Sequence, residues 1–183
     1  DFMNCVWYKK EILLSETDLQ GSRILFHIGA CDYETKVWVN GHSTGFSHKG
    51  GYTPIDLDIT PWVQPGSNRI TIAAYDDIRS FKQPGGKQSA RHNSYRCYYT
   101  RTTGIWQTVW LENTPAAFIK NVKMTPNAKD GELRLEVSTK NAELMTFKAE
   151  ISFKGEHIIT KERVIDWDNE QFSIIIPEDK RYL

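Results

Sequence analysis

The sequence predicts an all-β protein made of two sandwich-like units. Three observations lead to this fold class. Apolar and polar residues alternate with a period of two along most of the chain, and Asn40-Gly41 between two such runs is a strong hairpin signal. The six Trp and eight Tyr favour strands, while no long stretch has helical periodicity.

In the first part of the chain, each expected strand is an alternating run that ends at a turn signal. We expect strands over residues 6–14, 24–28, 35–39, 42–47, 56–59 and 70–75. Thr60-Pro61-Trp62 predicts one helical turn capped by Thr60. Residues 65–68 are rich in turn-forming residues and predict a loop.

A further strand is expected over residues 105–112, where both faces carry bulky side chains. Trp38 and Trp110 alternate with apolar neighbours, so we expect both in the core. Trp106 follows Gly104 near the strand's end, where either core packing or loop support fits.

The pattern changes to plain amphipathic strands after Asn113-Thr114-Pro115. We therefore expect two domains, residues 1–113 and 114–183. The second has about five strands, as in a partial immunoglobulin-like sandwich, whereas a complete one has seven in roughly 100 residues. Together with a first residue that is not Met, this predicts that the sequence is a piece of a longer chain.

Charge and hydropathy exclude several classes of function. Lys plus Arg and Asp plus Glu number 23 each, so no net field favours nucleic acid or an anionic membrane. No apolar run approaches the roughly 18 residues of a membrane span. We expect neither nucleic acid nor membrane as a partner. The location stays open, with a periplasmic or secreted parent protein as one option.

No cofactor or metal is expected from the residues present. Cys5, Cys31 and Cys97 are far apart and lack the spacing of a zinc site, and the five His lack it too. We interpret the Cys residues as buried reduced thiols, with one disulfide plus a free thiol as the alternative.

Catalytic residues are also not expected. Hydrolysis by a pair of carboxyl groups requires both groups to converge on the bond that is cleaved. Asp76-Asp77 is the one adjacent pair that ends a buried-looking strand, and neighbours on an extended strand point to opposite faces. The sequence therefore predicts no hydrolysis by this chain alone.

Residues 78–103 form a long stretch without apolar periodicity, which holds six Lys or Arg residues and no Asp or Glu. We call it the basic loop. A loop this long in a compact domain is usually functional or disordered. A solvated connector remains open, and so does a site where cations donate to sugar hydroxyls while aromatic rings stack on pyranose faces. A nucleic-acid patch is disfavoured by the neutral overall charge.

Three motifs in order resemble the sugar-binding domain of glycoside hydrolase family 2. They are Val37-Trp38-Val39-Asn40-Gly41, Gly50-Gly51-Tyr52-Thr53-Pro54, and residues 99–107 with the sequence YTRTTGIWQ. The resemblance implies a galactose-binding-like jelly roll over residues 1–113 and an immunoglobulin-like domain over residues 114–183. It also implies a separate catalytic barrel domain in the parent chain, beside whose mouth the basic loop lies.

For the site, the resemblance favours substrate contacts by Asp77, Lys87, Gln88 and Arg101. In glucuronidase-like and galactosidase-like members an Asp lies about six residues before the Gly-Ile pair, and here that position is Tyr98. This departure leaves the sugar specificity open.

The predicted function is thus a non-catalytic, sugar-binding accessory fragment of a β-galactosidase-like family 2 enzyme that cleaves β-linked sugars. Its partners are carbohydrate, bound weakly in isolation, and the catalytic barrel. The alternatives are a stand-alone carbohydrate-binding module and a structural spacer domain. A glycan array separates the binding module from the others, because fold alone does not decide function.

Overall fold

The computed structural model describes residues 3–181 and is almost entirely β-structure, as the sequence predicts. The chain divides into two compact units, Asp1–Thr114 and Pro115–Leu183. No helix within residues 3–181 has the length and apolar content needed to cross a membrane.

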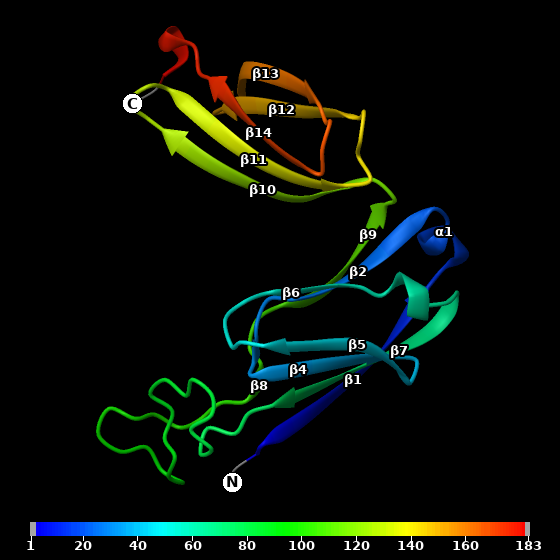
Figure 1. Cartoon of the computed structure of the whole chain (residues 1–183), viewed down its shortest axis with the longest axis vertical. Coiled ribbons are helices and arrows are strands. Elements are labelled where there is room, and N and C mark those ends of the chain that lie inside the picture. The colour runs from blue at the N-terminus through cyan, green and yellow to red at the C-terminus, as the bar shows by residue number, and fades with distance from the viewer. Residues whose placement is uncertain (1–2, 182–183) are drawn as a thin grey trace. The chain divides into compact units, whose positions relative to one another are not determined.

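The first unit is a sandwich of two main sheets, whose strands pair mostly in the antiparallel direction (Figure 1). The four-stranded sheet has the order β1 (Cys5–Leu14), β7 (Gly66–Tyr75), β4 (Glu34–Val39) and β5 (His42–Lys49). The three-stranded sheet has the order β6 (Ile55–Asp58), β2 (Ser22–Ile28) and β9 (Val109–Pro115). The short strands β3 (Cys31–Asp32) and β8 (Gly104–Ile105) pair separately.

The core of this unit lies between the two main sheets, because each contributes the apolar positions of its alternating strands. Its buried members include Ile24, Phe26 and Ile28 of β2, Val37 and Val39 of β4, and Ile70, Ile72 and Ala74 of β7. Burial of these side chains is the main stabilising contribution, at roughly 25 cal/mol per Å² of apolar surface.

The turn chemistry agrees with the sequence at the hairpin but not at the helical turn. Asn40 and Gly41 have φ values of 51° and 83°, the left-handed pair that a tight β4–β5 hairpin requires. The expected turn is the 3₁₀ helix η1 (Thr60–Trp62), but its N-cap is Ile59 and it has no side-chain cap. The Thr60 Oγ1 instead accepts the backbone N–H of Ile24 at 2.9 Å, so it ties η1 to β2.

One helix was not expected. The single-turn α1 (Glu16–Leu19) begins after Ser15, whose side chain accepts the backbone N–H of Asp18, while the Asp18 carboxylate accepts the backbone N–H of Ser15. This is a capping box, with Asp in place of the usual Glu or Gln.

The strand expected over residues 105–112 is in fact two strands. β8 ends at Ile105, β9 begins at Val109, and Trp106–Thr108 form an irregular link between them. The indole Nε1 of Trp106 donates to the carbonyl of Gly51 at 2.7 Å, while the carbonyl of Thr108 accepts the N–H of Gly29. These contacts with turns on either side replace the ladder pairing that a continuous strand would make.

The expected core positions of Trp38 and Trp110 are wrong. Trp38 is on the outer face of β4, half-buried against Trp7. Trp110 is 43% exposed and stacks on His27 with ring centroids 4.7 Å apart. Both strands carry bulky residues on both faces, so periodicity alone does not reveal which face points inward.

The second unit is a smaller sandwich with a three-stranded and a two-stranded sheet (Figure 1). The former has the order β10 (Phe118–Asn127), β11 (Glu132–Lys140) and β14 (Asn169–Ile175); the latter pairs β12 (Thr146–Phe153) with β13 (Glu156–Val164). The 3₁₀ helix η2 (Glu178–Lys180) follows β14. Leu135, Val137 and Ile174 form its buried core.

The three Cys residues are all free thiols in the structure. Cys31 is buried, as expected, Cys5 is half-buried and Cys97 is exposed. The expectation of buried thiols is therefore wrong for Cys97, which lies in the basic loop.

Candidate functional site

The basic loop leaves the sheets after β7 and returns at β8 without a regular strand between them (Figure 1). Its inner part is nevertheless held by hydrogen bonds. The fully buried Ser89 hydroxyl donates to the carbonyl of Asn93 at 2.8 Å and accepts the N–H of Arg91 at 3.1 Å. The Ser89 N–H donates to the carbonyl of Tyr99 at 2.8 Å. The loop therefore folds back on itself around one hydroxyl group.

The side chain of Gln88 fastens this loop to the sandwich. Its Nε2 donates to the Oδ2 of Asp32 at 3.1 Å, and its Oε1 accepts the backbone N–H of Thr102 at 2.8 Å. Asp32 is the last residue of β3. The Gln88 amide therefore joins the sandwich at Asp32 to the middle of the loop at Gln88 and to the end of the loop at Thr102. The sequence predicts Gln88 as a site residue but gives no such indication for Asp32.

A second carboxyl group, Asp76, lies at the root of the loop directly after β7. It accepts hydrogen bonds from the Gln83 amide and from the Thr103 hydroxyl, the latter at 3.1 Å, and only 3% of the residue is exposed. Burial raises the pKa of Asp76, against the opposing effect of these two donors. Burial also raises the pKa of Asp32, and the negative charge of Asp76 adds to that rise.

The negative charge of Asp76 thus acts on Asp32, an arrangement that the sequence does not predict. An acidic residue after a buried strand was the available signal, and we applied it only to residues 76 and 77. Both carboxyl groups already accept hydrogen bonds from loop side chains. The arrangement anchors the loop and does not present two open carboxylates to a substrate.

The four predicted substrate-contacting residues have different environments. Gln88 is half-buried and makes the two hydrogen bonds to Asp32 and Thr102 described above, which we call the Gln88 clamp. Lys87 beside it is exposed. The Arg101 Nη1 donates to the carbonyls of Arg91 at 2.9 Å and His92 at 3.3 Å, so this guanidinium supports the loop. Asp77 accepts the N–H of Arg79 within a tight turn.

Aromatic rings, most of them exposed, occur within the basic loop and in the contact between Tyr52 and Trp106. Tyr52, 81% exposed, meets Trp106 edge to face with centroids 5.4 Å apart. Tyr95 and Tyr98 stack at 5.0 Å, and the Arg91 guanidinium lies over Tyr95 at 4.1 Å. Such rings offer flat apolar faces next to hydrogen-bond donors, the usual composition of a small-ligand site. Within residues 3–181 no group of three or more His, Cys, Asp or Glu side chains is placed to hold a metal ion.

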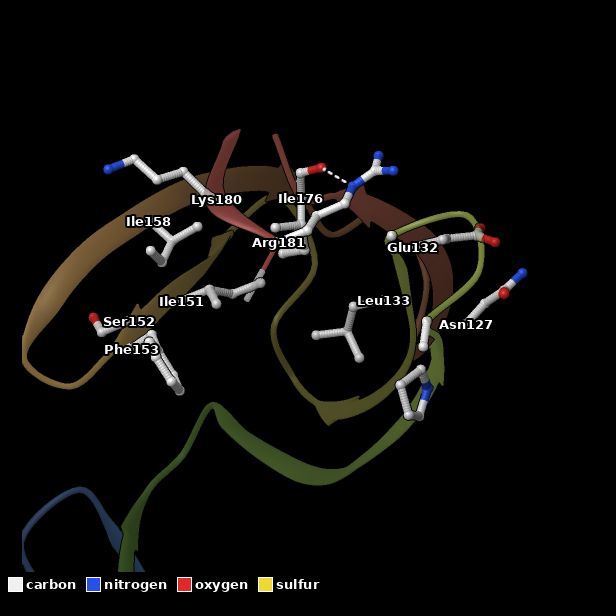
Figure 2. A pocket seen from close by; sticks show the side chains of 13 residues that line it. Asn127, Glu132, Leu133, Ile151, Ser152, Phe153, Ile158, Ile176, Lys180 and Arg181 are labelled. Carbon is white, nitrogen blue, oxygen red and sulfur yellow. Dashed lines mark hydrogen bonds between the residues drawn. The ribbon is translucent and has the colours of Figure 1, made fainter. Parts of the chain in front are cut away.

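The second unit has a hollow of about 310 Å³ at one end of its sandwich (Figure 2). Leu133, Ile151 and Ile158 line it, whereas the polar end of Lys180 points away. The Arg181 Nε donates to the carbonyl of Ile176 at 3.0 Å. The lining is mainly apolar, with Asn127, Glu132 and Ser152 among its polar members.

The family model "Glycosyl hydrolases family 2, sugar binding domain" matches residues 2–115, which is most of the chain and nearly the whole first unit. The chain belongs to glycosyl hydrolase family 2. The matched part contains both Asp32 of β3 and the basic loop with Gln88, so the hydrogen bond between these two residues lies within the sugar-binding domain of this family 2 chain.

Curated relatives agree with the family. Human β-glucuronidase is 30% identical over 170 residues, which cover 82% of this chain and 26% of that protein. The β-galactosidase of Thermoanaerobacter pseudethanolicus is 32% identical over 124 residues, 67% of this chain and 15% of that protein. This family 2 chain therefore spans about a quarter or less of these two relatives.

Solved structures show the same fold. A family 2 glycosyl hydrolase from Bacteroides cellulosilyticus has a TM-score of 0.70 at 19% identity, over 96% of this chain and 24% of that one. Faecalibacterium prausnitzii β-glucuronidase has a TM-score of 0.65 at 24% identity, over 95% and 32%. The predicted all-β sandwich fold is thereby confirmed.

Proposed function

We propose that the basic loop of this chain helps to hold the sugar in a family 2 enzyme that cleaves β-linked glycosides, and that the chain itself is not catalytic. The observation that carries the proposal is the Gln88 clamp, which fixes the loop while Lys87 and the nearby rings stay exposed. An ordered, cationic and aromatic edge suits a polyhydroxylated ligand beside a carboxylate-rich site.

The domain assignment is part of this proposal. We take residues 1–113 as a galactose-binding-like domain and residues 114–183 as an immunoglobulin-like domain, with the catalytic barrel of the parent as the partner. The names of the relatives, β-glucuronidase and β-galactosidase, support a β-glycosidase parent. The hydrogen bonds that Asp32 and Asp76 accept from loop side chains support a non-catalytic role here.

Replacement of Lys87 by Ala in the parent enzyme tests the loop. We expect a lower kcat/KM for its β-glycoside, by about tenfold, because a donor to the bound sugar is lost. Lys49→Ala, another exposed lysine on the same unit, is the matched control. An unchanged kcat/KM for Lys87→Ala would reduce the loop to a connector.

Two measurements on the chain alone complete the test. Pure protein should not hydrolyse nitrophenyl β-galactoside or β-glucuronide, and turnover abolished by Asp76→Asn would contradict this. Affinity of the basic loop for sugar should be millimolar or weaker, about 4 kcal/mol or less. Tight binding at the loop would favour the stand-alone binding module instead.

A further inference from the structure

The outer face of the four-stranded sheet carries a trough of about 890 Å³ that contains no residue of the basic loop. Trp7 of β1 and Trp38 of β4 reach across the central strand β7, with ring centroids 5.3 Å apart and ring planes at 35°. We call this hollow the tryptophan trough.

The strand register explains why the trough exists. Trp7 is opposite Ala73 and Trp38 is opposite Thr71, so small side chains of β7 lie between two large ones. Ile72 and Ala74 point into the core, which puts Ala73 on the outer face, and yet Ala73 is completely buried. The neighbouring side chains therefore close over it.

Polar side chains continue from the indoles along the same face. Lys9 is opposite Thr71, and Glu11 is opposite Arg69, with which it forms an ion pair at 2.8 Å. This pair neutralises its own charges and still has lone pairs and N–H groups for further hydrogen bonds.

This composition fits a sugar better than a protein partner. The two indoles are the only large apolar side chains among the residues that line the trough, and three of the other lining residues, Lys9, Glu11 and Arg69, are charged. The centre of a protein interface is depleted of Lys and Glu. An indole beside hydroxyl, amide, ammonium and carboxylate groups matches a pyranose, which has an apolar C–H face and a rim of hydroxyl groups.

We propose that the tryptophan trough is a second carbohydrate-binding site, which takes a neutral oligosaccharide of pyranose units stacked on Trp7. More than half of the Trp7 surface, 54%, is exposed, so a covering sugar gains hydrophobic stabilisation. The site does not depend on the function proposed for the basic loop.

Cellotetraose, xylotetraose and β-1,4-galactotetraose are the probes, titrated into the intact 183-residue chain. The indole N–H signals of Trp7 and Trp38 are followed by NMR. At least one tetraose should shift both signals in a saturable manner, with a Kd of about 1 mM. Trp7→Ala should weaken that binding about tenfold or more, because the stacking face is gone.

Two controls and one replacement variant keep the result interpretable. Trp167→Ala removes another exposed indole, in the second unit, and should bind normally. Lys87→Ala should also bind normally, which separates this site from the basic loop. If Trp7→Ala does not fold, Arg69→Ala replaces it, because loss of an exposed ion pair costs little stability, and it too should weaken binding.

Unmoved Trp7 and Trp38 signals with all three tetraoses at about 10 mM would overturn the proposal, since even weak binding is visible there. Wild-type affinity in Trp7→Ala would do the same. Signals that shift when the protein alone is concentrated, and cease to shift in Trp7→Ala, would identify the face as a contact between two copies and not as a sugar site.

Discussion

Replacing Gln88 by Ala should release the basic loop while the sandwich stays folded. The change removes two hydrogen bonds, from Nε2 to the Asp32 carboxyl group at 3.1 Å and from the Thr102 N–H to Oε1 at 2.8 Å. The neutral bond contributes about 1 kcal/mol and the bond to a carboxylate about 1.5–3 kcal/mol. Local opening should therefore become easier by about 2–4 kcal/mol.

Hydrogen exchange of the Thr102 amide measures this opening directly. Its protection should fall about 30-fold or more in Gln88→Ala, by the conversion of 1.4 kcal/mol per factor of ten. Lys87→Ala is the matched control, because it truncates the exposed neighbour and leaves both bonds in place. Amides of β7, such as that of Ile72, should keep their protection in both variants.

The Gln88→Glu variant tests the direction in which protection of the Thr102 amide changes with pH. The new carboxylate still accepts the Thr102 N–H but faces Asp32 with like charge, so protection should be lost at neutral pH and recover on acidification. Wild-type protection of Thr102 in Gln88→Ala, or a pH-independent response in Gln88→Glu, would refute the clamp.

Three further outcomes follow from other buried contacts. Gly104→Ala should lower the free energy of unfolding by at least about 2 kcal/mol, because φ is +97° and a Cβ would overlap the Tyr8 Oη. Thermal melts measure this loss, with Gly85→Ala as the control, since a Cβ at Gly85 would meet open space. Asn68→Ala should cost about 2–3 kcal/mol in chemical denaturation, because this buried amide satisfies several backbone groups. Burial raises the pKa of Asp76, so the folded state binds more protons than the unfolded state. The free energy of unfolding should therefore fall as the pH rises from about 4. Denaturation at a series of pH values measures this fall, and Asp76→Asn should make it smaller.

Local signals in the sequence were sufficient for much of the fold. The Asn40-Gly41 hairpin needs left-handed backbone at two adjacent positions, a requirement set by the turn residues themselves. Strand positions followed from alternation wherever one face was plainly apolar, as in β11 and residues 70–75 of β7. The loop predicted over residues 65–68 is wrong, because β7 begins at Gly66 and residues 66–68 pair with β1. The capping box at Ser15 and Asp18 was readable too, and we missed it because Asp replaces the usual Glu or Gln.

Alternation does not identify the inward face of a strand when both of its faces carry bulky side chains. Trp38 and Trp110 sit on outer faces, where Trp7 and His27 cover them in part. Residues 105–112 contain no turn signal, yet Trp106 leaves the ladder because its indole N–H donates to the carbonyl of Gly51. Both outcomes depend on partners distant in sequence, which a periodicity does not contain.

The sequence by itself determined the all-β class, the hairpin, the position of the basic loop and, through its ordered motifs, the family. These depend on neighbouring residues and on composition. Only the tertiary structure showed that Gln88 joins Asp32 to Thr102, and that Trp7 and Trp38 meet across β7. The physical reason is that a hydrogen bond or ring contact needs atoms brought within a few ångströms, and strand pairing over tens of residues decides which atoms those are.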